Sequence, residues 1–356
     1  MDTVNTQITK ETKNKIRVNY EGKLSGKERL SYKLKSSKTW ISLVVKMFKF
    51  ILMLGVSFVI LHPFIAQIAG SFMSAADVAD VTVAVIPKNF TVNQYVAIAT
   101  ETEYFDSLIN TALISLVCAL IQTFISCLIG YGLAKFKFKG NNLIMLCVVF
   151  TMIIPPAALK FSLQTHFENF DFLKLAVFDY RGIFDILSGG KQMDLTGTFW
   201  PFIILSITGL AFKNGLYIYL MRQFFKGIPD ELEESAYVDG SGTFRTFFRI
   251  ILPLTVPMLI TVFLFSFSWQ WTDTFYSTVF DLYDEVTFAP DILSELANEL
   301  YLPESLTEGQ FIADMKSYTL VLRYTFAIMF LFPLVIVYLF FQKYLVQGIE
   351  RSGITG

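Results

Sequence analysis

The sequence predicts an all-α protein that crosses a membrane six times. Of its 356 residues, 54% are hydrophobic and only 17% are charged, a balance outside the usual range for soluble globular domains. The apolar residues also gather in runs of about 20, the length that a helix needs to cross the hydrocarbon core. The predicted spans are 50–72, 109–134, 143–161, 198–222, 254–279 and 317–342, of which 143–161 is short and interrupted by proline.

The first span follows a polar tail, residues 1–49, which is rich in Lys, Ser, Thr and Asn. The tail has too few apolar residues to build a core, so we expect it to be flexible up to the basic stretch near Trp40 that meets the membrane. Because no small-residue cleavage site follows 50–72, we expect a true span and not a removable signal. His62 and Pro63 within it are expected to mark a kink.

The charges are distributed unevenly along the chain, and this predicts its orientation. Residues 1–49 hold twelve Lys and Arg against four acids, whereas the segments 73–108 and 280–316 hold five and nine acids with one lysine each. Since cytoplasmic segments of membrane proteins are enriched in Lys and Arg, the N terminus is predicted to be cytoplasmic. With six spans, the C-terminal tail 343–356 and the segment 223–253 are then also cytoplasmic.

The external segments 162–197 and 280–316 are longer than most connections between helices, and loops of such length usually have a function of their own. Both carry apolar residues, so we expect folded pieces within them. In the second, Ile292, Leu293, Leu296 and Leu300 are spaced as on one face of a helix, which predicts a short external helix.

The polar segment 223–253 carries the strongest local signals. Pro229, followed by Asp230 and Glu231, is typical of a helix start, because a carboxylate there is stabilised by the helix dipole. Gly240 is placed to end that helix. A second helix is predicted to begin at Ser241 or Thr243. Its apolar face is formed by Phe244, Phe247, Phe248 and Ile251, and another face carries Arg245 and Arg249.

A motif in this segment resembles the EAA signature of permease subunits of ATP-binding-cassette (ABC) importers. Glu234-Ser235-Ala236 is followed by three residues, Gly240, nine residues and Ile250-Ile251-Leu252-Pro253. Ser235 departs from the alanine that the signature prefers, but serine is small enough to keep the close packing.

Further stretches resemble the carbohydrate-importer branch of this family, in particular subunits similar to the maltose permease protein of the G type. They are IPKNFTVNQY at 86–95, KFKFKGNN at 135–142, IIPPAA at 153–158, LMRQFFKGIPDELEESAYVDG at 220–240, Trp271-Thr272-Asp273, and QKYLVQGIERSGITG at 342–356. The resemblance covers the chain from about residue 50 to its end. It implies the type I ABC importer (MetI-like) permease fold in a prokaryotic inner or plasma membrane.

The resemblance also implies partners and a coupling role. The partners are a sister permease in the lipid bilayer, a cytoplasmic ABC ATPase dimer and an extracellular or periplasmic solute-binding protein, with no nucleic acid. In such importers the EAA segment forms coupling helices that dock into a cleft of the ATPase. The residues implied for this coupling are Glu233, Glu234, Ser235, Ala236, Asp239, Gly240, Leu252 and Pro253.

We expect no enzyme activity and no cofactor or metal in this chain, with ATP and Mg²⁺ used by the partner ATPase. The sequence has no G-x-x-x-x-G-K-[ST] phosphate-binding loop. It has only two histidines, His62 and His166, too few for a His-based metal cluster. Cys118, Cys127 and Cys147 lie in apolar runs without the paired spacing of disulfides or zinc ligands.

Polar residues within the predicted spans are candidates to line a solute pathway, because ionisable groups at membrane depth usually face a cavity or a partner. Each has an alternative reading: interhelical hydrogen bonding for Gln122 and Asn214, a carbonyl or carboxylate of a sister permease for Lys213, and the wet outer interface for Asp273 and Arg323. The candidates are Gln122, Lys213, Asn214, Gln270, Trp271, Asp273 and Arg323.

Three other functions stay open at this point. The first is an ABC permease for a solute that is not a sugar, since the sequence does not name the sugar. The second is an ion-coupled secondary transporter, which would require paired intramembrane acids and two related halves. The third is an intramembrane enzyme, which would require convergent His, Asp, Glu, Ser or Lys groups at membrane depth.

Overall fold

The computed structural model describes residues 10–11, 17–18, 37–171, 193–282, 286–298 and 308–351. Apart from one pair of two-residue strands, the regular elements of this part of the chain are helices, which confirms the all-α prediction. The chain divides into two units, residues 1–66 and 67–356.

The first unit contains the strand pair and most of one long helix. β1 (Lys10–Glu11) pairs with β2 (Arg17–Val18) in antiparallel register. α2 (Ser37–Gly70) begins well before the predicted boundary at residue 50 and continues through Pro63. Lysine is a good helix former, so the lysines that made 37–49 look like a tail are compatible with an extension of the apolar helix.

Three helices contain windows long and apolar enough to cross a membrane: Trp40–Gly70 in α2, Tyr104–Lys135, which is α5, and Lys316–Gly348 in α17 (Glu308–Arg351). Two bent pairs also qualify. α6 (Asn141–Ile153) and α7 (Pro156–Glu168) meet at 103°, and Thr243–Leu254 meets α14 (Val256–Trp271) at 75°. The described residues therefore give three to five candidate spans, and six crossings remain a prediction.

The predicted span 198–222 differs most from a straight helix. It is divided into α9 (Trp200–Thr208) and α10 (Asn214–Lys226), each too short to cross alone. Gly209 ends α9 in the left-handed region, at φ 73°, which glycine adopts without steric cost. Likewise, α6 ends at Ile153, just before Pro155 and Pro156, because proline has no N–H to continue the helical hydrogen bonds.

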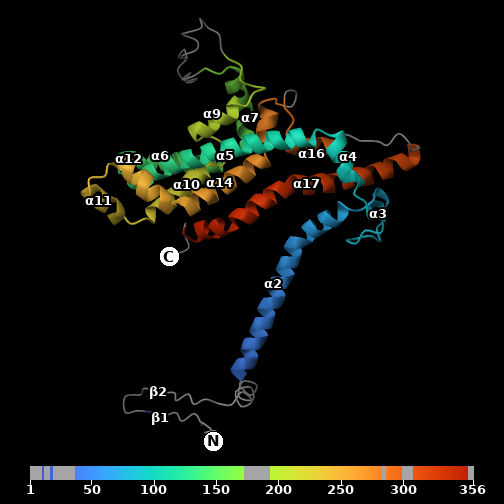
Figure 1. The fold of residues 1–356 in the computed structure, drawn as a ribbon, viewed down its shortest axis with the longest axis horizontal. Helices are drawn as coiled ribbons and strands as arrows, with labels where there is room; N and C mark the ends of the chain where they lie inside the picture. The colour runs from blue at the N-terminus through green and yellow to red at the C-terminus, as the bar shows by residue number, and fades with distance from the viewer. Residues whose placement is uncertain are drawn as a thin grey trace. The chain divides into compact units, whose positions relative to one another are not determined.

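Within the second unit, α5 lies at the centre of a helical bundle (Figure 1). It packs against α9, α10 and α14, and α14 in turn packs against α17. The approach of α5 to α10 depends on Gly130, since a Cβ there would lie 2.6 Å from the Cβ of Met221. Small residues at such crossings allow helix backbones to come close in membranes.

Short helices cover the end of the bundle predicted to be external. They are α3 (Ala75–Ala79), α4 (Asn93–Glu101), α15 (Phe275–Val279) and α16 (Ala289–Asn298). α16 confirms that a short helix lies within 280–316, as predicted, although Leu300 lies outside the described residues; its external location remains a prediction. Of the predicted loop 162–197, residues 162–168 belong to α7, and residues 172–192 lie outside the described part.

Candidate coupling segment and solute pathway

The segment Asp230–Pro253, here called the coupling segment, begins with α11 (Glu231–Val238). Three glutamates stand in its first turn, where the positive end of the helix dipole stabilises them. The Asp230 side chain makes no capping bond to the helix. Its carboxylate instead accepts a bond from a lysine of another helix, described below.

Gly240 ends α11 in a double hydrogen-bonded cap. The amide of Ser241 donates to the carbonyl of Ala236 at 2.9 Å, and the amide of Gly240 donates to Tyr237 at 3.0 Å. Gly240 has φ 78°. This is the Schellman arrangement, which requires a left-handed residue at this position. The prediction that Gly240 stops the helix is confirmed.

The second helix begins at Thr243, as predicted, but its apolar face differs from the expected one. α12 (Thr243–Thr246) passes into the π-helix η1 (Phe247–Ile251), where Leu252 N–H bonds to the carbonyl of Phe247, and then into α13 (Leu252–Leu254). Such five-residue bonds widen the turn and shift the periodicity of the side chains. Phe247 and Ile251 are buried, whereas Phe244 is 81% exposed and Phe248 is 49% exposed.

The residues implied for coupling divide into an inner and an outer set. Glu233 and Ala236 are buried within this chain, so Ala236 is not available for close approach to another protein. Leu252 is partly buried in the core. Glu234, Ser235, Asp239, Gly240 and Pro253 are exposed.

Sequence reasoning did not identify the apolar side chains that the coupling segment exposes. Val238 is 88% exposed, and Leu232 and Tyr237 are also exposed. Together with Phe244 they form what we call the coupling surface. Val238 and Phe244 flank the Gly240 turn in the sequence, a position from which their exposure could have been inferred once the turn was expected.

Lys135, the last residue of α5, ties the coupling segment to the helical bundle. Its Nζ donates to the Ile228 carbonyl at 2.7 Å and to the Asp230 carboxylate at 2.6 Å, and its side chain is only 6% exposed. This hydrogen bond from Lys135 lowers the pKa of Asp230 below its ordinary value. These two bonds connect the last residue of α5 to the residues just before α11. The connection lies at the end of the bundle where α11 and α12 lie (Figure 1).

An aromatic contact lies beside this connection. The ring of Tyr131 in α5 packs against Phe247 of η1 and Phe225 of α10, with centroid distances of 4.7 and 5.4 Å. The Tyr131 hydroxyl is close enough to the buried Glu233 carboxyl for the two groups to interact electrostatically. The coupling segment is thus packed on the bundle by apolar, aromatic and charged contacts.

The candidate pathway residue Gln122 bridges three helices. Its Nε2 donates to Ser206 of α9 at 3.0 Å, and its Oε1 accepts a bond from Ser266 of α14 at 2.6 Å. The side chain is buried. Gln122 therefore acts as an interhelical hydrogen-bonding group, which was the alternative reading.

Trp271 is likewise a core residue. Its ring stacks on Phe330 of α17 at a centroid distance of 5.7 Å, and its Nε1 donates to the Phe330 carbonyl at 3.2 Å. The side chain is 2% exposed, so it offers no face to a solute.

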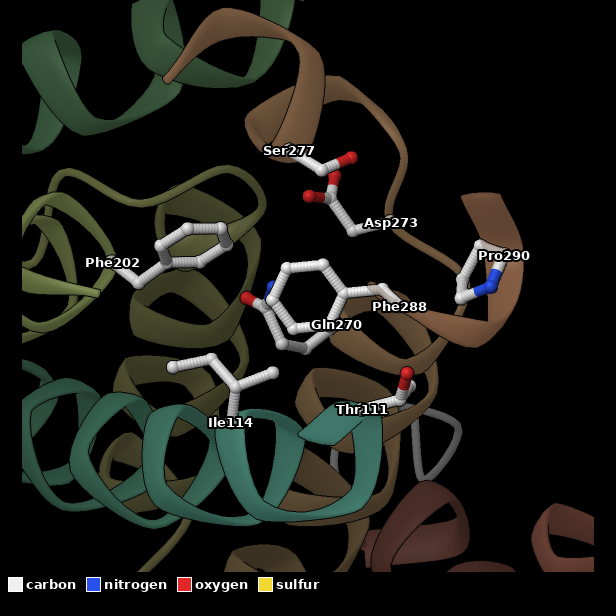
Figure 2. Close-up of a pocket in the computed structure, with 8 residues that line it drawn as sticks. All are labelled: Thr111, Ile114, Phe202, Gln270, Asp273, Ser277, Phe288 and Pro290. Carbon is white, nitrogen blue, oxygen red and sulfur yellow. The ribbon is translucent and has the colours of Figure 1, made fainter. Parts of the chain in front are cut away.

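Gln270 and Asp273 meet at a cavity of about 10 Å³ (Figure 2), the room that one water molecule needs. Asp273 and Ser277 line one side of it, and Thr111 and Ile114 of α5 the other. The Asp273 carboxylate already accepts the Tyr276 amide at 3.0 Å. A sugar does not fit into a space of this size.

Lys213 and Asn214 lie at the break between α9 and α10. Lys213 has φ 68°, an uncommon value for a residue with a side chain, and its Nζ lies 4.3 Å from the centroid of the Trp269 ring. Asn214 is fully buried, and its side-chain amide has no hydrogen-bond partner within the described residues. Trp269 was not among the predicted residues.

Arg323 lies apart from this break. It is exposed on α17 and lines a groove of about 510 Å³ with Gln67, Pro290 and Tyr324 among others. The structure therefore brings Lys213 together with Asn214, and Gln270 with Asp273, but it does not assemble all seven candidates into one site. In the described part of the chain, no three His, Cys, Asp or Glu side chains are grouped so that they could hold a metal ion.

Comparisons with known proteins relate the chain to transporters. The polygalacturonan/rhamnogalacturonan transport system permease protein YtcP of Bacillus subtilis (strain 168) is 24% identical over 298 residues, covering 83% of this chain and 92% of that protein. The maltodextrin transport system permease protein MalD of Streptococcus pneumoniae (strain ATCC BAA-255 / R6) is 25% identical over 309 residues, covering 86% and 94%.

A solved structure supports the same fold. A chain of a bacterial alginate ABC transporter, in complex with an alginate pentasaccharide-bound periplasmic protein, superposes with a TM-score of 0.60 at 14% identity, covering 88% of this chain and 98% of that chain. Residues 122–351, well over half of the chain, match the family model of the binding-protein-dependent transport system inner membrane component. The chain therefore belongs to this family as an ABC transporter permease, in which ATP hydrolysis lies in a separate subunit.

Proposed function

We propose that this chain is the transmembrane permease subunit of an ATP-driven importer of carbohydrates, and that its coupling segment docks on the ATPase. The single observation that carries the coupling role is the capped turn at Gly240, in which two backbone hydrogen bonds fix the end of α11 just before the following helix. A rigid element can transmit a displacement, whereas a loose loop absorbs it.

The exposed apolar side chains of the coupling surface favour the docking of a partner protein. Val238 and Phe244 are among the most exposed apolar side chains of the second unit, and apolar side chains that are exposed together mark interaction sites. Glu231, Glu234 and Asp239 of the same segment are also exposed. An apolar centre with a polar rim is the usual anatomy of a protein interface.

The connection through Lys135 gives this docking a mechanical consequence. When the ATPase subunits draw together on binding ATP, they would displace the coupling segment, and α5 would follow through its bonds from Lys135. We propose that this movement opens the pathway to the outside, and that release after hydrolysis opens it to the cytoplasm. The sister permease would supply the other half of the pathway.

The carbohydrate assignment rests on the relatives. Their names specify maltodextrin and polygalacturonan/rhamnogalacturonan transport, and we extend the class of solute, not the individual sugar, to this chain. The partners we propose are a sister permease, an ATPase dimer and an external solute-binding protein. The N and C termini and the coupling segment are proposed to be cytoplasmic, with six crossings.

Copurification of the ATPase tests the docking role. We expect the double variant Val238→Asp and Phe244→Asp to copurify with at least tenfold less ATPase than the parent chain. The reason is that burying each apolar side chain contributes about 1.5–3 kcal/mol to binding. Ile86, which is 83% exposed in the segment predicted to be external, provides the matched control. Loss of ATPase from Ile86→Asp, or full retention by the double variant, would contradict the assignment.

A further inference from the structure

The break between α9 and α10 places a charged residue in an unusual backbone conformation. Lys213 adopts φ 68° directly before α10 begins at Asn214. Residues with a Cβ pay a steric cost in this region, so such conformations persist where the surroundings or a function require them. A turn closes here, since the Asn214 backbone N–H donates to the Ala211 carbonyl at 3.0 Å; its third position, where glycine is usual, is occupied by lysine.

Lys213 lies within the membrane in the orientation proposed above. The 13 residues of α10 separate it from the cytoplasmic end of that helix, a rise of about 20 Å. The hydrocarbon core is about 30 Å thick. Trp269 lies a similar distance along α14 from its start at Val256, so both helices bring their residues to the same depth.

The Lys213 ammonium lacks a counter-charge at this depth. Its Nζ lies over the Trp269 ring, and no carboxylate of the described residues lies within salt-bridge distance. An ammonium has three donors, and contact with one ring face leaves donors for another group. An unpaired charge at membrane depth faces a cavity or a partner and not lipid.

The surroundings of the ammonium suit a sugar. Trp269 is 53% exposed, and Thr272, which follows it by three residues and thus lies on the same face of the α14 end, is also exposed. Thr208, at the end of α9, is exposed as well. An exposed indole face can pack against a sugar ring. The two threonine hydroxyls donate to carbonyls of their own helices and can still accept bonds.

We propose that Lys213 and Trp269 form a subsite for an acidic sugar residue during transport. The ammonium binds the carboxylate of a uronic acid, and the exposed part of the indole packs against the sugar ring. A charge-assisted bond to a carboxylate is stronger than one to a neutral hydroxyl, so an unpaired ammonium favours the acidic substrate. This inference rests on the proposed function as a carbohydrate permease.

The test compares two trisaccharides in proteoliposomes that contain the whole complex and its binding protein. One is radiolabelled trigalacturonate, and the other is the same molecule with its carboxyl groups reduced to alcohols. We expect ATP-dependent uptake of the acidic sugar to be about tenfold faster in the parent protein. Lys213→Gln should abolish this preference, and Lys213→Arg, which keeps the charge, should retain most of it.

Two controls separate the subsite from general damage. Lys160→Gln removes another exposed lysine charge, from α7, and should not alter the preference. Trp269→Leu should slow the uptake of both sugars severalfold, whereas Trp200→Leu, which removes another exposed indole, should slow neither.

Three results would overturn the subsite. The first is that the parent protein takes up the two sugars equally or not at all, and the second is that Lys213→Gln slows the uptake of both sugars equally. The third is that the sister permease is lost from the Lys213→Gln complex, which would show that Lys213 pairs with a carboxylate of that subunit. The proposed function would fail separately, through absence of a copurifying ATPase.

Discussion

Gly240→Ala is expected to loosen the coupling segment by a calculable amount. A Cβ at this position meets no atom within 4 Å, so the substitution introduces no clash. The cost comes from φ 78° alone, because an L-residue in the left-handed region is disfavoured by roughly 1–2 kcal/mol. Opening of the cap should therefore increase about 5- to 30-fold.

Gly242→Ala provides the matched control in the same turn. Gly242 also has open space at its Cβ position, but its φ is −78°, which alanine adopts freely. The two variants thus add the same methyl group two residues apart, and only one of them is strained.

Hydrogen exchange measures the effect directly. The Ser241 amide, which donates to Ala236 in the cap, should exchange about 5- to 30-fold faster in Gly240→Ala and at the parental rate in Gly242→Ala. Of the two alanine variants, only Gly240→Ala should lower the uptake per ATP hydrolysed. Gly240→Pro should lower it further. Equal exchange and equal coupling in the two alanine variants would refute the reasoning.

Three further substitutions test the contacts around this segment. Lys135→Met should destabilise the complex by about 1 kcal/mol in thermal unfolding and reduce coupling. Because the pKa of Asp230 is lowered, its bond to Lys135 is present above about pH 4 and is lost only as the pH falls further, so parental coupling should not vary between about pH 5.5 and 8; a drop in that window would argue against the bond. Gln122→Leu removes two interhelical hydrogen bonds and should lower stability by about 1–2 kcal/mol, and an unchanged melting temperature would exclude the bridging role. Gly130→Ala should cost about 1–3 kcal/mol by overpacking, whereas Gly132→Ala, with open space at its Cβ, should be neutral; similar losses in both would show that the crossing is not tight at Gly130.

The sequence predicted the parts of the fold that depend on local chemistry. The acids at Asp230 and Glu231, the glycine at 240 and the apolar spacing of Ile292 and Leu293 each correspond to an observed helix or cap. These signals act over one or two turns, so they do not require knowledge of tertiary contacts.

Contacts between distant segments were not predictable in the same way. Of the four residues on the predicted apolar face, the structure buries only Phe247 and Ile251, and a period of 3.6 residues does not indicate which members of a face another helix covers. Lys135 is one of three lysines within residues 135–140, and only the fold selects it as the partner of Asp230.

The same limit applies to the pathway residues. Trp269 and Trp271 are two residues apart and therefore point to different sides of α14, but the sequence does not indicate which side is covered by α17. The structure buries Trp271 and exposes Trp269. The left-handed conformation of Lys213 was also unexpected, because lysine gives no signal for it.

Photo-crosslinking from the coupling surface tests the central claim most directly. A benzophenone amino acid placed at Phe244 in the assembled complex should crosslink to the ATP-hydrolysing subunit, identified by mass spectrometry. Phe161 of α7 is the matched position, because it has the same exposed fraction of 81%. It lies at the end of the span 143–161 that is predicted to be external, so it should give no such product. An ATPase crosslink from 161, or none from 244, would contradict the account.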